Sequence, residues 1–131
     1  MKIFIHGLES SNQGEKAIYF RERFPEMLIP YFSGDLRERM DALHELLMAK
    51  AGITLIGSSF GGLMASLFAM VDEERVDRLI LLAPALNHME SSGFLLRELS
   101  VPVLIYHGEQ DEVIPIHAVE KAAQKYFRNF Q

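Results

Sequence analysis

The chain has 131 residues, of which 49% are hydrophobic and 24% charged, so it is long enough to build one hydrophobic core. It contains no cysteine, which excludes disulfides, thiolate nucleophiles and cysteine-ligated metals. The formal charge is −5 and the lysines and arginines are scattered, which gives no electrostatic reason to expect nucleic acid or an anionic membrane as a partner. We therefore expect one domain over residues 1–131.

The N-terminal apolar run is too short for a signal peptide or a membrane span, so it predicts a first strand and a cytoplasmic protein without a membrane span. Further short apolar runs follow it along the chain. The predicted strands are residues 3–5, 27–32, 53–56, 79–83 and 101–106. Most of these runs are continuous rather than alternating, which is typical of parallel strands buried on both faces. Pro30 indicates an edge position for the second strand.

Helical patterns separate these strands. The predicted helices cover residues 12–23, 35–50, 60–71 and 116–130, with Ser11 or Asn12 capping the first and Asp35 the second. The alternation of strands and helices predicts a three-layer α/β sandwich with a mostly parallel five-stranded sheet. In such sheets ligands bind beyond the carboxyl ends of the strands, so candidate site residues should directly follow each strand.

The third strand is followed by Gly57-Ser58-Ser59-Phe60-Gly61, a G-x-S-x-G pattern between a buried strand and an apolar helix. A tight strand-to-helix turn holds its central serine in a strained conformation, and small flanking residues leave the hydroxyl accessible. The following helix dipole and the Phe60 amide favour a developing negative charge. Ser59 is therefore the candidate nucleophile; the alternative is a structural turn in which it only caps the helix.

Two further strands end in polar loops. The first is followed by His6-Gly7-Leu8, where we expect His6 to shape the turn rather than to catalyse. The last is followed by a loop with three acids, Glu109, Asp111 and Glu112. A carboxylate here can orient the base of a catalytic triad, or it can simply stabilise the turn.

The segments I-F-I-H-G-L-E-S-S, G-S-S-F-G-G-L-M-A, L-L-A-P-A and Y-H-G-E-Q-D-E-V-I-P resemble small, cap-less, esterase-like α/β-hydrolases, in particular the YqiA-like group. The resemblance covers nearly the whole chain. It implies a minimal α/β-hydrolase fold and a serine hydrolase of carboxylic esters or thioesters. Ser59 matches the nucleophile and Asp111 the triad acid, while the amides of Leu8 and Phe60 match the oxyanion donors.

The same resemblance indicates a departure at the C-terminus. The family's last strand and the histidine that follows it have no counterpart, so we expect a fold that lacks the last strand. A serine without a base is a poor nucleophile. His117, close to Asp111 in sequence, and His88, after the fourth strand, are the candidate substitute bases.

Three interpretations stay open: an enzyme that uses a substitute base, an enzyme completed by a homodimer partner, and a catalytically impaired module that binds an acyl ligand or a partner chain. Residues 87–100 predict either a small lid or an ordinary short helix. In the lid reading, Met89, Phe94, Leu95 and Leu96 would line an acyl pocket. The sequence holds no metal-ligand spacing and no dinucleotide or phosphate loop, so we expect no metal and no cofactor.

Overall fold

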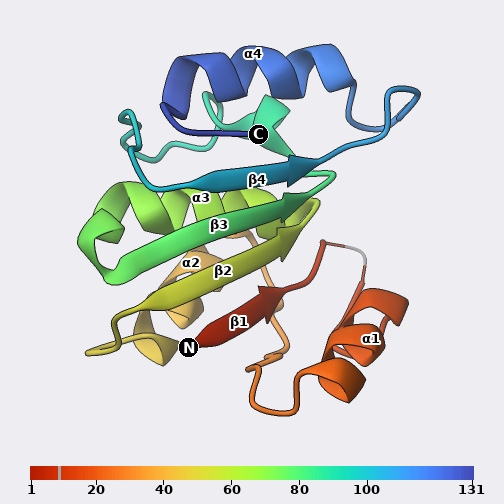
Figure 1. Cartoon of the computed structure of the whole chain (residues 1–131), viewed down its shortest axis with the longest axis vertical. Coiled ribbons are helices and arrows are strands. Elements are labelled where there is room, and N and C mark those ends of the chain that lie inside the picture. Colours follow the sequence, from red (N-terminus) through yellow and green to blue (C-terminus); the bar gives the residue numbers. More distant parts are fainter. Residues whose placement is uncertain (9) are drawn as a thin grey trace.

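The structure is a computed structural model that describes residues 1–8 and 10–131; Glu9, in the loop after the first strand, lies outside the described residues. One sheet of four parallel strands has the order β1-β2-β3-β4 (Figure 1). The strands are β1 (Lys2–Ile5), β2 (Ile53–Ser58), β3 (Val76–Leu82) and β4 (Val103–Tyr106). The helices are α1 (Glu15–Arg23), α2 (Leu36–Leu46), α3 (Phe60–Asp72) and α4 (Ile116–Tyr126), with short 3-10 turns η1 (Glu73–Arg75) and η2 (Leu86–His88).

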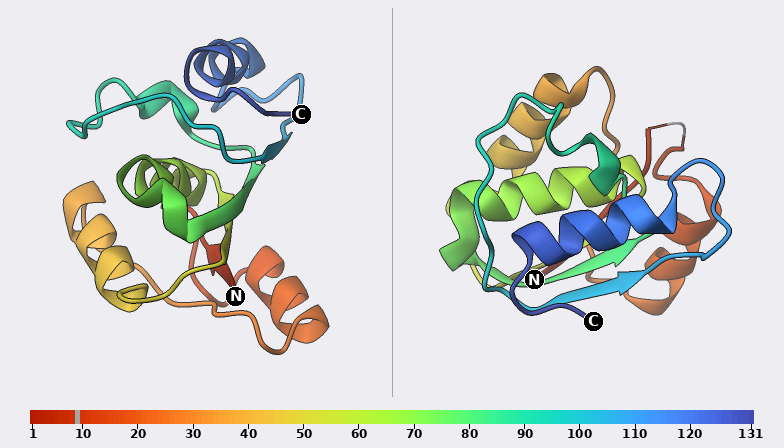
Figure 2. Two further views of the ribbon diagram at one scale, coloured as in Figure 1. Left: turned by 60° about the vertical axis from the view of Figure 1, so that its left-hand side comes forward. Right: turned by 90° about the horizontal axis from the view of Figure 1, so that it is seen from above.

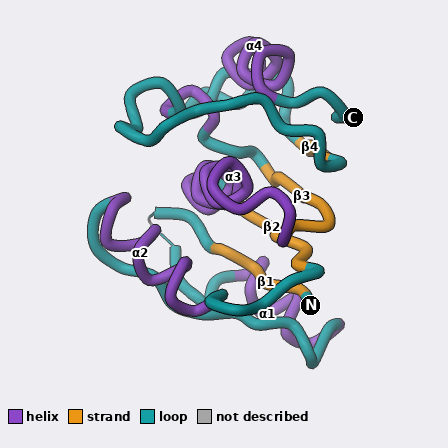
Figure 3. Tube along the Cα trace, turned by 90° about the vertical axis from the view of Figure 1, so that its left-hand side faces the viewer, coloured by secondary structure: helices purple, strands orange, loops and turns teal. Residues whose placement is uncertain are grey.

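Helices cover the two faces of the sheet unequally. Figure 2 shows α2 and α3 on one side of the strands and α1 on the other, and Figure 3 shows the axis of α3 between α2 and α4. The larger buried cluster lies on the α3 side and includes Leu55, Leu81 and Phe68. A smaller cluster around Phe4 and Ile56 lies under α1. The expected three-layer α/β architecture with a parallel sheet is therefore confirmed.

The expectation of a fifth strand over residues 27–32 is wrong. Only one bridge forms there, between Ile3 and Leu28. Beyond it, side chains replace the strand ladder: the Asn12 amide donates to the Ile29 carbonyl, and His6 accepts the N–H of Phe32. Leu28 makes two backbone hydrogen bonds to β1, with Lys2 and Phe4, but Pro30 has no N–H to donate, so this pairing does not continue along the run.

Three helix boundaries also differ from the expectation. The second helix ends at Leu46 rather than at residue 50. The first helix begins at Glu15 rather than at residue 12, and neither Ser11 nor Asn12 caps it. The last helix ends at Tyr126 rather than at residue 130, because Phe127 is extended. The residues after it lie along the edge of β4: the N–H of Val103 donates to the Asn129 carbonyl and the N–H of Gln131 to the Val103 carbonyl. Two parallel bridges, Leu99 to Phe127 and Val103 to Phe130, mark this pairing.

Local sequence explains the two helices that frame the site. Asp35 caps α2 through a capping box with Glu38, as its sequence pattern predicts. One stripe of α2, which includes Met40 and Leu43, is buried, whereas α3 is buried almost all round. The apolar composition of α3 therefore fits its central position.

The strand register brings the ends of the strands to one edge. Ser58 of β2 lies opposite Leu82 of β3, and Leu82 lies opposite Tyr106 of β4. Residues that directly follow these strands therefore meet at the carboxyl edge of the sheet. Among the described residues, no helix is both long enough and apolar enough to cross a membrane.

Candidate functional site

Ser59 has a left-handed backbone, with φ of 56° and ψ of −115°, at the turn from β2 into α3. A non-glycine residue in this region is strained and persists only where its surroundings fix it. Four hydrogen bonds do so here. The N–H of Ser59 donates to the Leu82 carbonyl (2.9 Å), and its carbonyl accepts from Gly62 (2.9 Å), Leu63 (3.3 Å) and Ala85 (2.9 Å). These bonds fasten the strained turn to β3, to the residues that follow it and to the first turn of α3.

Glycines let the backbone segments around Ser59 approach one another. A side chain at Gly61 would collide with the Ile5 carbonyl of β1, and one at Gly57 would lie 2.6 Å from the Gly61 carbonyl carbon. A Cβ at Gly62 would lie 2.6 Å from the Cβ of Pro84. Close approach, rather than a positive φ, therefore requires glycine at these positions.

The two amides matched to oxyanion donors belong to segments that adjoin the candidate nucleophile. The N–H of Phe60 is the first of α3, a helix with no acidic residue in its first turn. Leu8 lies in the loop after β1, where Gly7 comes so close that a Cβ there would be 3.3 Å from the Cβ of Ser59. Within residues 1–8 and 10–131, neither amide donates to another group. A helix N-terminus with free donors attracts negative charge.

His6 fixes the loop that carries Leu8. Its ring is buried; Nδ1–H donates to the Gly7 carbonyl at 2.7 Å, and Nε2 accepts the N–H of Phe32 at 2.9 Å. These two bonds require the neutral Nδ1–H tautomer. The ring also stacks on Tyr31, with 5.5 Å between ring centres. With both nitrogens engaged by backbone, His6 holds the turn together.

Asp111 lies in the loop between β4 and α4. Its Oδ1 accepts the N–H groups of Ile114 at 2.8 Å and of Val113 at 2.9 Å. The Ile114 amide, supported by that of Val113 and by nearby His107, outweighs the opposing effect of burial and holds the pKa of Asp111 below its usual range. Asp111 is therefore a carboxylate at neutral pH. The other two acids of the loop, Glu109 and Glu112, are exposed.

His107 belongs to the same loop and has no place in the sequence prediction. Its side chain is 3% exposed, and its Nε2–H donates to the Ile114 carbonyl at 2.6 Å. The same nitrogen lies 3.8 Å from Oδ2 of Asp111, whereas Nδ1 is buried without a partner among the described residues. The signal available in the sequence was repetition, because His107-Gly108 follows β4 as His6-Gly7 follows β1.

The two histidines named as substitute bases lie on the surface. His88 ends η2, exposed, with its ring near the Asn87 amide, and His117 is exposed in the first turn of α4. In the part of the chain that the structure describes, neither forms an ion pair or hydrogen bond with Asp111 or Ser59. The structure thus brings Gly7 of the loop after β1 close to Ser59, and it shows neither histidine bonded to the candidate nucleophile or acid among the described residues.

The segment 87–100 is mostly irregular beyond η2. Met89 is buried, Phe94 and Leu96 are half-buried against the larger core, and Leu95 is exposed. Glu73 fastens the end of the segment, since its carboxylate accepts the N–H groups of Ser100 and Val101. A continuous short helix, one of the two expectations for this segment, is therefore not formed beyond η2.

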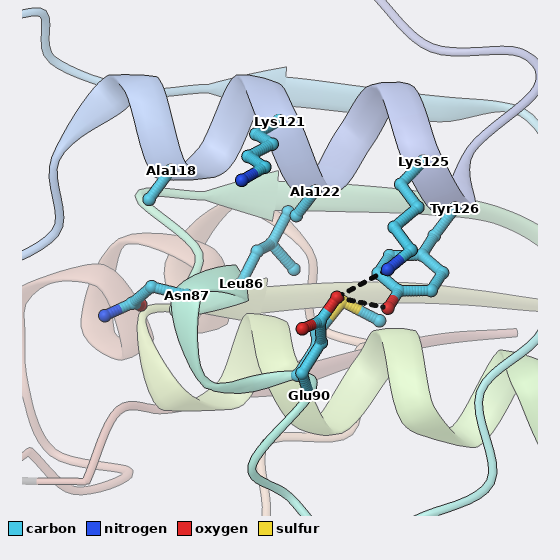
Figure 4. A pocket seen from close by; sticks show the side chains of 9 residues that line it. Leu86, Asn87, Glu90, Ala118, Lys121, Ala122, Lys125 and Tyr126 are labelled. Carbon is cyan, nitrogen blue, oxygen red and sulfur yellow. Dashed lines mark hydrogen bonds and ion pairs between the residues drawn. The ribbon is translucent and has the colours of Figure 1, made fainter.

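A hollow of about 200 Å³ lies between η2 and α4 (Figure 4). Leu86 and Ala122 form part of its apolar wall. Glu90 accepts hydrogen bonds from Lys125 (2.6 Å) and Tyr126 (3.2 Å) across it. These bonds connect η2 and its following turn to α4.

Comparisons with known proteins agree with this fold. A family model described as the alpha/beta hydrolase fold matches residues 10–93. A comparison with curated proteins gave no match. Among solved structures, alpha/beta hydrolase domain-containing protein 10 from mouse superposes with a TM-score of 0.82 at 18% identity, over 99% of this chain and 77% of that chain.

Two bacterial structures are similarly close. A protein of the alpha/beta superfamily from Xanthomonas campestris pv. campestris has a TM-score of 0.75 at 26% identity, over 99% of this chain and 84% of its own. Est1E from Butyrivibrio proteoclasticus, solved with ferulic acid bound, has a TM-score of 0.78 at 22% identity, over 99% of this chain and 76% of its own. At such identities these similarities concern the fold.

Proposed function

Because the chain belongs to the α/β-hydrolase fold family, we propose that it is a serine hydrolase that cleaves carboxylic esters or thioesters through an acyl-enzyme on Ser59. The observation that carries the proposal is the left-handed backbone of Ser59 at the β2–α3 turn. Strained residues of this kind cluster at active sites, and a capping serine has no need of positive φ.

The proposed reaction begins when the Ser59 oxygen attacks the substrate carbonyl carbon and loses its proton to a base. The N–H groups of Leu8 and Phe60 stabilise the negative charge on the tetrahedral intermediate. The C–O or C–S bond to the leaving group then breaks, and the base returns the proton to that group. Water attacks the acyl-enzyme in the same way and releases the acid.

Asp111 is proposed to orient the histidine that acts as this base. His88 and His117 are the two candidates within the chain, and a homodimer partner is the other source. The substitutions His88→Gln and His117→Gln separate them, because removing the base should slow hydrolysis by several powers of ten. If that histidine comes from a partner copy, the same substitution should abolish activity, because both copies carry it, but activity per molecule should then also fall on dilution.

The direct test is intact mass after treatment with a fluorophosphonate, which reacts only with an activated serine. We expect one stoichiometric adduct that Ser59→Ala abolishes. Ser58→Ala is the matched control, since Ser58 is the buried neighbour of Ser59 at the end of β2 and should leave labelling intact. Hydrolysis of a short-chain p-nitrophenyl ester should follow the same pattern.

One observation favours a second function, a non-catalytic module that keeps the pocket to bind an acyl ligand or a partner chain. Among the described residues, the histidine beside Asp111 is His107, and its Nε2–H is already used by the Ile114 carbonyl. Absence of any adduct in a folded protein would establish this alternative over the enzyme.

A further inference from the structure

Arg39 is a buried cation next to the candidate site. It lies in α2 and is 5% exposed. Its guanidinium lies over the ring of Phe60, with Cζ 5.5 Å from the ring centre. Phe60 directly follows Ser59 and carries one of the proposed oxyanion amides. Arg39 therefore packs on the side chain of the residue that directly follows the candidate nucleophile.

The guanidinium has few partners for a buried group. Nε donates to the Gly34 carbonyl at 2.8 Å, whereas Nη1 is fully buried and bonds to nothing within residues 1–8 and 10–131. The two nearby carboxylates, Asp35 and Glu38, bond to each other's backbone in the α2 capping box. Because arginine stays protonated in proteins, the charge remains inside the fold with donors unused.

Packing alone does not account for an arginine here. An unbranched apolar side chain such as methionine would cover Phe60 without desolvating a charge. Buried cations are normally matched by carboxylates or fully hydrogen-bonded. The unused donors of Arg39 are arranged as a planar fork, which fits the two oxygens of a carboxylate.

The neighbouring loop ties Arg39 to the same edge as Ser59. Residues 32–34 are fastened at one end to His6, through the N–H of Phe32, and at the other to Arg39, through the Gly34 carbonyl. His6 in turn holds Gly7, which adjoins Ser59. This chain of hydrogen bonds therefore connects Arg39 to the corner that adjoins Ser59.

We propose that Arg39 binds an ionised carboxylate of the ligand, so that the preferred substrates are esters that carry a carboxylate in addition to the ester group. This inference rests on the proposed function only in so far as the bound esters are called substrates. Binding of the anion can be measured without turnover, so the two proposals can fail separately.

The test compares two ligands that differ by one charge, monomethyl glutarate and dimethyl glutarate. Their binding to Ser59→Ala is followed by ¹H–¹⁵N NMR titration, because this variant cannot turn them over. We expect the anionic ester to bind at least about tenfold more tightly than the neutral one. Introducing Arg39→Met into the Ser59→Ala variant should remove that preference, while the affinity for the neutral ester stays unchanged.

Arg37→Met is the matched control. Arg37 lies two residues away in α2 and also over an aromatic ring, that of Phe94, but it is exposed. It should leave the preference in place. Arg39→Lys keeps the charge without the fork and should retain only part of the preference, and this variant also serves if Arg39→Met does not fold.

Equal affinity for the two esters would overturn the proposal. So would a loss of preference in Arg37→Met as large as in Arg39→Met, because the attraction would then be a general surface effect. Weaker binding of both esters in Arg39→Met and Arg39→Lys alike would assign Arg39 a purely structural role. Fluorophosphonate labelling of Ser59 in the otherwise unmodified chain reports separately on the proposed function.

Discussion

Two strands of the sheet end in the same dipeptide, His6-Gly7 after β1 and His107-Gly108 after β4, but the two corners are held differently. At the β1 corner both ring nitrogens bond to backbone, one to Gly7 and one to Phe32 of a distant segment. At the β4 corner one nitrogen bonds to Ile114 of its own loop, and the other has no partner among the described residues.

The glycines show the same contrast. A Cβ at Gly7 would lie 3.3 Å from the Cβ of Ser59, whereas a Cβ at Gly108 would meet nothing within 4 Å. The β1 corner is thus packed into the candidate oxyanion side, and the β4 corner carries Asp111 on a loop that is bonded mainly to itself. The comparison indicates that the two halves of the candidate site differ in how firmly the core fixes them.

The sharpest test of this contrast is His6→Ala, which should lower the free energy of unfolding by about 3 kcal/mol. It removes two buried hydrogen bonds and leaves the Phe32 N–H without an acceptor. Urea denaturation measures the loss. His107→Ala is the matched control and should cost about half as much, because that ring makes one bond. Equal losses would mean that the two corners are held equally firmly.

Asp111→Asn should slow fluorophosphonate labelling of Ser59 by roughly 10²-fold or more, because the proposed base loses the carboxylate that orients it. Glu109→Gln, an exposed acid of the same loop, should leave the rate unchanged. An unchanged rate in Asp111→Asn would remove this residue from the proposed mechanism and leave its loop a structural element.

The lowered pKa of Asp111 also predicts that the stability of the fold depends on pH. The Ile114 amide favours the ionised form in the folded protein, so the carboxylate stabilises the fold above the usual aspartate range. This stabilisation is lost as pH falls through the lowered pKa. Wild type and Asp111→Asn should therefore differ in urea midpoint at neutral pH and converge in acid, and a constant difference would contradict the assignment.

Much of this site follows from local sequence. The turn at Ser59 needs small residues at Gly57 and Gly61, and the capping box of α2 needs Asp35 and Glu38, so each pattern is legible within a few positions. The structure of the 27–32 segment cannot be predicted from its neighbours in the same way, because the imidazole that binds the Phe32 N–H lies 26 residues away in the sequence. Apolar composition alone cannot distinguish a strand from a segment held by such a side chain.

The missed residues share a physical reason. His107 and Arg39 are polar groups whose importance comes from burial and from unused donors or acceptors, and neither property can be derived from their neighbours in the sequence. The end of the last helix was missed for a related reason. Phe127 and Phe130 continue the apolar stripe of α4, but they instead pack where the chain pairs with β4.

Gly7→Ala should slow labelling of Ser59 by about tenfold. Its new methyl group would lie 3.3 Å from the Cβ of Ser59 and 3.5 Å from the Ser58 carbonyl, so the loop or the serine must shift by a few tenths of an ångström. Small displacements of reacting groups have large effects on rate. Unfolding free energy should fall by only about 1 kcal/mol. A rate that stays at the wild-type value would show that the β1 corner is not close to the reacting hydroxyl.

Gly108→Ala at the other corner should have the smallest effect and the opposite sign. The position has open space around it and does not have a positive φ, so alanine fits the folded chain. Alanine also restricts the unfolded chain, which should raise the free energy of unfolding by about 0.5 kcal/mol, with no change in labelling. Urea denaturation and labelling rates measure both. If Gly108→Ala instead slowed labelling as much as Gly7→Ala does, the β4 corner would have to approach the serine as closely as the β1 corner, and the contrast between them would fail.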